Sequence, residues 1–214
     1  MDGMTEDAER PGAEHWVPRG ADLDGLRHAA EGCRGCELWR DATQVVFSRG
    51  AADARMMLVG EQPGDREDQE GEPFVGPAGR VLGEAIDAAG LTEDQVYRTN
   101  AVKHFRFERR GKRRIHEKPG MAHIAACHPW LEQEIALVRP AVIVALGATA
   151  ARAVLGSPVK IGEVRGMVLE SPDGTPTIVT THPSGILRIR DEDDRRRAHD
   201  GLAADLRRAA ELIG

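Results

Sequence analysis

Three cysteines are the residues whose types and spacing most directly suggest chemistry. Cys33 and Cys36 form the motif CRGC, and Cys127 stands alone further along the chain. An odd number of cysteines argues against a disulfide framework, whereas a CxxC pair indicates metal binding or redox chemistry. Four ligands are the usual complement of a closed metal site or an iron–sulfur cluster. One ligand is therefore missing from the cysteine count, and a histidine is the obvious substitute.

A second group of chemically capable side chains follows short apolar runs. GEQPGD, TNAVKH and THPSG carry Glu61, Gln62, Asn100 and His182. An Asn side chain both donates and accepts hydrogen bonds, so it can read the amide-like edge of a pyrimidine. A His can stabilise a departing anion, and Phe74 in GEPFVGPAGR can stack on a flat ring. Taken singly, each also has a structural interpretation: Phe74 as core, Asn100 as a turn cap, and His182 as a residue held by backbone partners.

A basic segment runs from Lys103 to Gly120. It contains eight Lys or Arg residues against two Glu residues, a local charge of +6 in a chain of net charge −6. Such a run is often only a solvated loop. Its cations could equally neutralise the phosphates of DNA. His116 ends the densest part of the run, GKRRIH.

The hydrophobic pattern predicts the elements that position these residues. Short apolar runs, typical of buried parallel strands, alternate with amphipathic segments, typical of helices. We expect strands at 54–61, 95–102 and 141–147, and a last one within 175–185. We expect helices at 22–32, 78–89, 121–138, 148–155 and 195–213. This order indicates an α/β fold, a three-layer α/β/α sandwich around a central parallel sheet.

In such sheets the ligand crevice lies beyond the carboxyl ends of the strands. The strand-end segments should therefore meet at one edge. Of these segments, GAT at 147–149 carries no residue with comparable chemical potential.

Length and composition suit one cytoplasmic, monomeric domain without membrane association. The 214 residues are 41% hydrophobic and 30% charged. No apolar run approaches the roughly 20 residues that span a bilayer. The acidic, polar start of the chain is unlike a signal peptide. We expect a flexible leader at 1–21 and a single domain at 22–214.

Taken together, the motifs resemble those of a known family. GEQPG, GEPFVGPAG, TNAVKH and THPS occur in the order found in the iron–sulfur uracil-DNA glycosylases of family 4. The resemblance covers about 23–212 and implies the uracil-DNA glycosylase fold with an iron–sulfur cluster at one side. It is closer still to the UdgX-type subgroup, which carries Gln in GEQPG, His in VKH and an inserted KRRIH loop.

The resemblance implies the missing metal ligand. Where the family has a fourth cysteine, this chain has His104. We therefore expect a structural [4Fe–4S] cluster held by Cys33, Cys36, His104 and Cys127. His123 and His128 flank Cys127 and compete for the histidine role. On ligand type alone, three Cys and one His would also suit zinc.

The resemblance further implies a substrate and site residues. The expected partner is uracil-containing single-stranded DNA, and double-stranded DNA is an alternative substrate. The expected catalytic residues are His116, which attacks C1′ and stays covalently bonded to it, Glu61, which orients His116, and His182, which supports the departing uracil. The expected substrate-binding residues are Gln62, Asp65, Phe74 and Asn100. The expected DNA contacts are Lys112, Arg113, Arg114 and Ser184.

Two other interpretations stay open. The first is a conventional family 4 glycosylase that turns over, in which His116 only contacts DNA. The second is a non-catalytic, metal-stabilised module that binds single-stranded DNA. A generic nucleotide-binding enzyme is disfavoured because neither a GxxxxGK[ST] nor a GxGxxG loop is present.

Overall fold

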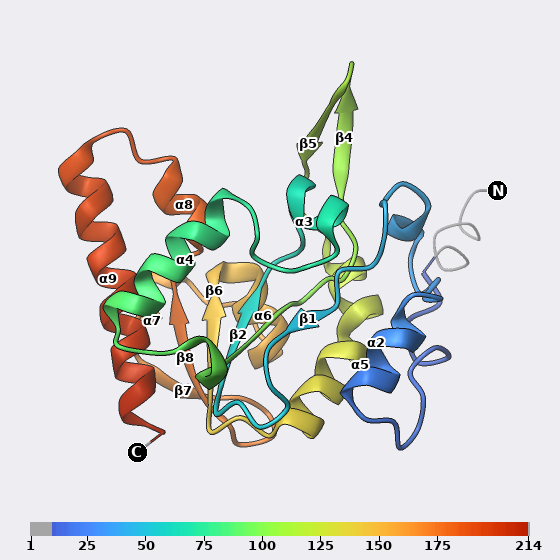
Figure 1. The fold of residues 1–214 in the computed structure, drawn as a ribbon, viewed down its shortest axis with the longest axis horizontal. Helices are drawn as coiled ribbons and strands as arrows, with labels where there is room; N and C mark the ends of the chain where they lie inside the picture. Colours follow the sequence, from blue (N-terminus) through green and yellow to red (C-terminus); the bar gives the residue numbers. More distant parts are fainter. Residues whose placement is uncertain (1–9, 214) are drawn as a thin grey trace.

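A six-stranded sheet with the order β1-β3-β2-β6-β8-β7 forms the centre of the computed structural model, which describes residues 10–213 (Figure 1). The four inner strands are parallel. They are β3 (Val96–Asn100), β2 (Met56–Gly60), β6 (Val142–Leu146) and β8 (Pro176–Thr180). The edge strands β1 (Ser48–Arg49) and β7 (Val168–Glu170) run antiparallel to their neighbours. The predicted parallel sheet is confirmed, and the unpredicted edges are too short to show periodicity.

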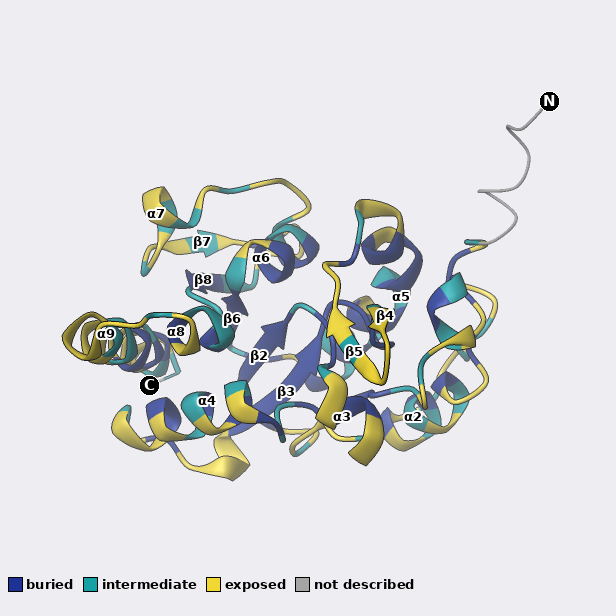
Figure 2. Cartoon of the chain, turned by 90° about the horizontal axis from the view of Figure 1, so that it is seen from above, coloured by how far each residue is buried: buried dark blue, intermediate teal, exposed yellow. Residues whose placement is uncertain are grey.

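Helices cover both faces of this sheet (Figures 1 and 2). One face packs against α4 (Pro77–Ala88), α8 (Pro183–Leu187) and α9 (Glu192–Glu211). The other packs against α5 (Met121–Val138) and α6 (Gly147–Leu155), with α2 (Leu23–Ala30) in the same core. Strand β2 shows why there are two cores. Its side chains alternate, so Met56 and Leu58 enter the first and Met57 and Val59 the second.

Short elements complete the part of the chain described by the structure. These are η1 (Glu37–Arg40), α3 (Asp65–Glu70), η2 (Glu93–Gln95), β4 (Phe107–Arg110), β5 (Arg113–His116) and α7 (Ile161–Val164). Among the helices within 10–213, none has the length and apolarity required to cross a bilayer.

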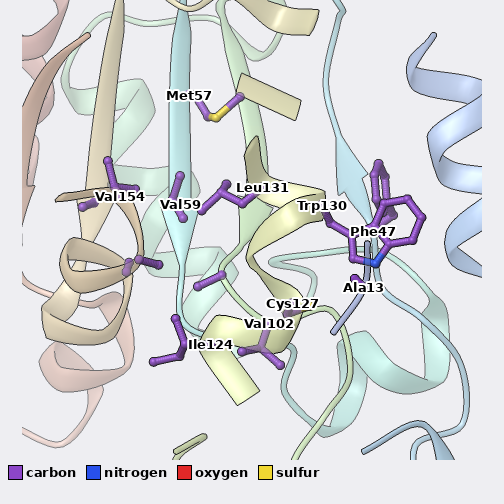
Figure 3. Packing of buried hydrophobic residues seen from close by; sticks show 14 of the residues in the cluster. Ala13, Phe47, Met57, Val59, Val102, Ile124, Cys127, Trp130, Leu131 and Val154 are labelled. Atoms are coloured by element: carbon purple, nitrogen blue, oxygen red, sulfur yellow. The ribbon is translucent and has the colours of Figure 1, made fainter. Parts of the chain in front are cut away.

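The core that includes α5 also contains the three cysteines. Figure 3 shows Cys127 in this core, on the same helix as Trp130. The rings of Phe47 and Trp130 meet edge to face with centroids 5.7 Å apart. The cysteines therefore lie in apolar surroundings, away from bulk water.

The expected flexible leader, 1–21, is described by the structure only from residue 10 onward. Residues 1–9 lie outside the described residues, but residues from 10 onward attach to the domain. The Gly12 amide donates to Gly35 (3.0 Å) and the Ala13 amide donates to Ala126 (2.8 Å), and Ala13 is fully buried. The polar composition hid this attachment because it depends on backbone hydrogen bonds.

The basic segment is a β-hairpin rather than a loop. Strands β4 and β5 pair antiparallel, from Phe107 opposite His116 to Arg110 opposite Arg113. Gly111 in the turn has φ +61°, a conformation that glycine adopts without steric cost. The hairpin projects from the body (Figure 1) and is largely exposed (Figure 2).

A buried ion pair joins the sheet to α5. Lys103 and Glu134, which are 1% and 0% exposed, form a direct salt bridge. The Lys103 ammonium also donates to Thr99 Oγ1 (2.5 Å) and to the main-chain oxygen of Asn100 (3.0 Å). Tyr97 Oη donates to Glu134 Oε1 (2.9 Å). Every member of this network therefore has a hydrogen-bond partner.

Removal of the Glu134 charge should lower the stability of the fold. Glu134→Gln leaves the Lys103 cation buried without a counter-charge, which should lower the free energy of unfolding by about 3–5 kcal/mol. The matched variant Tyr97→Phe removes a neutral hydroxyl that bonds both Glu134 Oε1 and Ser48 Oγ, and it should cost about 2 kcal/mol, roughly 1 kcal/mol for each hydrogen bond. Urea unfolding measures both, and equal losses in the two variants would contradict the importance of the ion pair.

Candidate active site and metal centre

A cleft of about 1060 Å³ lies at the carboxyl edge of the parallel strands. Segments following β2, β3, β6 and β8 line it, together with residues of β5 and α3. Eight of the expected site residues border the cleft: Glu61, Gln62, Asp65, Phe74, Asn100, His116, His182 and Ser184. Lys112, Arg113 and Arg114 border a separate, shallower hollow on the hairpin. The strand-end loops thus meet, as the topology predicts.

Glu61 and His116 face each other across the cleft. The imidazole Nε2 of His116 is 3.3 Å from Glu61 Oε1, and Thr149 Oγ1 donates to the other carboxylate oxygen. Burial alone would raise the pKa of Glu61, but the hydrogen bonds of His116 and Thr149 lower it overall. Glu61 is therefore an anion at neutral pH. In the sequence, the GAT segment that supplies Thr149 gives only a weak signal, because it offers a single hydroxyl after a strand.

His182 is held as a neutral hydrogen-bond donor. The backbone amide of Ser184 donates to its Nδ1 (3.1 Å), which assigns the ring proton to Nε2. Burial lowers the pKa of His182 to about 4, so the ring is uncharged at neutral pH. Gly147 has φ +88°, and a Cβ there would lie 3.0 Å from the Cβ of His182. The close approach of these two loops therefore requires glycine.

Phe74 and Asn100 border the same part of the cleft. Phe74 has φ +59°, which is rare for a bulky residue and marks a strained, specifically held position. A Cβ on Gly60 would lie 2.3 Å from Asn100 Oδ1 and 2.7 Å from Phe74 Cζ. Asn100 is only 3% exposed, whereas Phe74 is half-buried. Glycine at position 60 therefore lets an aromatic ring and an amide approach each other.

Gln62 has a different environment from the one expected. Although it borders the cleft, its amide Nε2 donates to the main-chain oxygens of Arg106 and Glu117, both at 3.1 Å. Its Oε1 accepts from the Arg106 amide at 3.1 Å. Gln62 thus clamps the base of the hairpin that carries His116.

Arg114, expected to contact DNA, is instead turned toward the protein. Its side chain is 13% exposed and forms ion pairs of 2.5 Å with both Asp65 and Asp68 on α3. Asp65, expected to bind substrate, is likewise engaged by Arg114. Lys112 and Arg113, at the exposed turn, remain on the solvent side of the hairpin.

The three cysteines lie close enough to influence one another electrostatically. Cys33 Sγ accepts from the Gly35 amide and from Trp130 Nε1, both at 3.4 Å. Cys127 Sγ accepts from the Lys103 amide at 3.3 Å. Burial raises the pKa of Cys36 to about 11 and that of Cys127 to about 12. In such surroundings a bound cation is what converts the thiols to thiolates.

The expected ligand set has the chemistry of a metal site. His104 is buried, and burial lowers its pKa to about 4, which leaves a neutral imidazole. Three cysteine sulfurs and one imidazole suit zinc as well as an iron–sulfur cluster. Among residues 10–213, no group of three or more His, Cys, Asp or Glu side chains is arranged to hold a metal ion. His123 is engaged elsewhere, because its Nε2 lies 2.8 Å from Glu37 Oε1.

Comparisons with known proteins agree with this architecture. A model of the uracil DNA glycosylase superfamily matches residues 47–207. The chain is 39% identical over 165 residues to the type-4 uracil-DNA glycosylase of Thermotoga maritima, covering 77% of this chain and 82% of that relative. It is 31% identical over 199 residues to the type-4 enzyme of Archaeoglobus fulgidus, covering 90% of this chain and 94% of that relative.

The neutral state of the half-buried His182 ring should make the free energy of unfolding depend on pH. Its folded pKa of about 4 lies below the ordinary value of 6.5, so the unfolded chain binds more protons between these pH values. The free energy of unfolding gained from this group is present above pH 6.5 and is lost as the pH falls toward 4. His182→Gln should flatten that slope, as measured by urea unfolding across this range. An unchanged slope would show that His182 is not buried as a neutral ring.

Proposed function

Because the chain belongs to the uracil-DNA glycosylase superfamily, we propose that it excises uracil from DNA and then bonds through His116 to C1′ of the abasic sugar. One observation carries the covalent part of this proposal. The His116 imidazole borders the cleft, 3.3 Å from the half-buried Glu61 carboxylate, which can take its proton. A nucleophile beside an oriented base is the arrangement that covalent catalysis requires.

The cleft residues support recognition of uracil. Phe74 stacks on the base, and Asn100 reads the N3 and O4 edge. The 4-amino group of cytosine reverses the hydrogen-bond polarity of that edge, so cytosine is rejected. The base reaches the cleft by flipping out of a duplex or directly from a single strand.

Departure of uracil and bonding of His116 to C1′ together conserve protons and electrons. The C1′–N1 bond breaks and its electron pair leaves with uracil, whose O2 accepts a hydrogen bond from His182 Nε2. Glu61 takes the proton from the His116 nitrogen that it contacts. The lone pair left on that nitrogen forms the new bond to C1′. The proton passes from Glu61 to the uracil anion or to solvent, and the imidazole remains attached to the sugar.

The hairpin and the cleft rim contact the DNA backbone. Lys112 and Arg113 at the turn neutralise phosphates, a contribution to affinity that does not depend on sequence. Ser184 lies at the cleft rim and supplies a further contact. Its backbone amide at the same time holds His182.

Cys33, Cys36, His104 and Cys127 would hold a [4Fe–4S] cluster, which would act structurally by cross-linking the segments that contribute its ligands. The support is the donor set itself: three buried sulfurs, of which those of Cys33 and Cys127 accept N–H hydrogen bonds, and a neutral buried imidazole. His104 precedes the hairpin by only a few residues. The cluster would therefore fix the start of the segment that leads to His116.

The covalent proposal is tested with a uracil-containing oligonucleotide on a denaturing gel. The protein should form an adduct that survives denaturation. His116→Ser should form none but should still release uracil, because a water can occupy the vacated space beside C1′. Lys112→Ala is the matched control and should keep the adduct while lowering the salt slope of binding by about one. Uracil release without any adduct by the unaltered protein would instead establish a conventional, turning-over glycosylase.

The cluster proposal predicts a brown protein with about four irons per chain. His104→Ala should reduce the iron content and the visible absorbance. His123→Ala is the control and should retain both, because Glu37 already engages its ring. A colourless protein with stoichiometric zinc would exclude the cluster, and iron loss in the control alone would move the histidine ligand to position 123.

A further inference from the structure

We infer that Arg114 is a positioning residue for His116: it docks the hairpin onto α3 and thereby sets the distance between the imidazole and the sugar. This inference rests on the proposed covalent function. It also separates Arg114 from the cations at the hairpin turn, which share its sequence context but not its environment.

Arg114 makes several contacts with the body of the protein, and its side chain is only 13% exposed. Its Nε lies 2.5 Å from Asp65 Oδ1, and its NH1 lies 2.5 Å from Asp68 Oδ2 and 3.0 Å from Thr43 Oγ1. Its NH2 donates to the main-chain oxygen of Asp65 (3.2 Å). The guanidinium also lies 5.1 Å from the centroid of the Phe107 ring. With its donors and its face engaged, this side chain is poorly placed to bind phosphate.

The Asp68 carboxylate, which accepts a hydrogen bond from Arg114, lies in the protein interior. Asp68 is fully buried, and both of its carboxylate oxygens also accept from the Thr43 amide, at 3.0 and 3.1 Å. A buried carboxylate needs a cation with matching geometry. The planar fork of an arginine can reach two carboxylates at once, which a lysine ammonium cannot do.

The strand geometry connects this anchor to the reactive residue. Arg114 and His116 are two apart on β5, so their side chains project from the same face of the strand. Arg114 meets α3, and His116 meets Glu61. With Gln62 clamping the base, the hairpin is held at two levels, and the imidazole lies between them along the chain.

Loss of the Arg114 contacts with α3 should therefore slow the bonding of His116 to C1′ and leave the release of uracil unchanged. Departure of uracil depends on Phe74, Asn100 and His182, none of which contacts Arg114. Attack on C1′ requires a nitrogen held within about 3–3.5 Å of the carbon, and a displacement of 1 Å costs about 100-fold in rate. The diagnostic quantity is the share of excision events that end in an adduct.

The test compares Arg114→Gln, Asp68→Asn and the double variant with Arg113→Gln, which removes the same charge from the neighbouring position. Uracil release and adduct formation are measured on one uracil-containing oligonucleotide at several salt concentrations. Each anchor variant should reduce the adduct share at least ten-fold and keep uracil release within two-fold. The double variant should be no worse than Arg114→Gln alone, because that change already removes the contact with Asp68. Arg113→Gln should keep the adduct share and lower the salt slope.

Two outcomes of this comparison would overturn the inference. One is an adduct share in both anchor variants equal to that of the unaltered protein. The other is an equal loss of release and capture in Arg114→Gln with a lowered salt slope, which would identify a phosphate contact.

A hydrogen-exchange measurement decides the docking even if the unaltered protein forms no adduct and the covalent proposal fails. Amides of β4 and β5 should exchange faster in Arg114→Gln and Asp68→Asn than in Arg113→Gln, with the central strands unchanged. Equal exchange of the hairpin amides in all three variants would refute the anchor on its own.

Discussion

The buried ion pair between Lys103 and Glu134 is the interaction on which the rest of the structure depends. Its cation donates to the main-chain oxygen of Asn100, and the backbone amide of the same lysine donates to Cys127 Sγ. Lys103 thus contacts both Asn100, which borders the cleft, and Cys127. His104 follows it directly, and the hairpin begins soon after. A buried charge pair is costly to desolvate and gives little net stability, but it accepts few alternative geometries. It therefore fixes how the sheet, α5 and the hairpin meet.

The basic segment shows that neighbouring cations of one type have unlike roles. Arg106 pairs with Glu117 at the hairpin base, Arg114 pairs with α3, and Arg110 pairs with Glu108. Positive charge counted along the sequence is thus partly neutralised by the protein itself. Lys112 and Arg113, near the turn, are exposed to solvent and are the cations proposed to contact DNA. An overall acidic chain can carry such a local patch because screening limits the reach of the distant carboxylates.

Sequence patterns predicted the inner strands, the main helices and the gathering of polar residues at one edge, because burial in a parallel sheet imposes continuous apolar runs. They did not predict the hairpin, since its alternation is hidden when nearly every position is charged. They also gave no sign of contacts that depend on a distant partner. Arg114 is paired with two aspartates of α3. Thr149 and Gln62 gain their roles from Glu61 and from the hairpin base. Such pairings are set by tertiary geometry and leave no local pattern.

The hairpin is closed at its base by a hydrogen bond from the Glu117 amide to the Arg106 carbonyl, at 3.0 Å. Its two ends are thus already adjacent in the body, and a Cβ at Gly111 in the turn would meet only open space. At its turn, a segment with these properties can be lengthened or shortened with little disturbance of the core. On the proposed function, short insertions at this turn change whether the abasic sugar bonds to protein or to water. Phe74 and Asn100, which select the base, lie outside the hairpin and stay as they are.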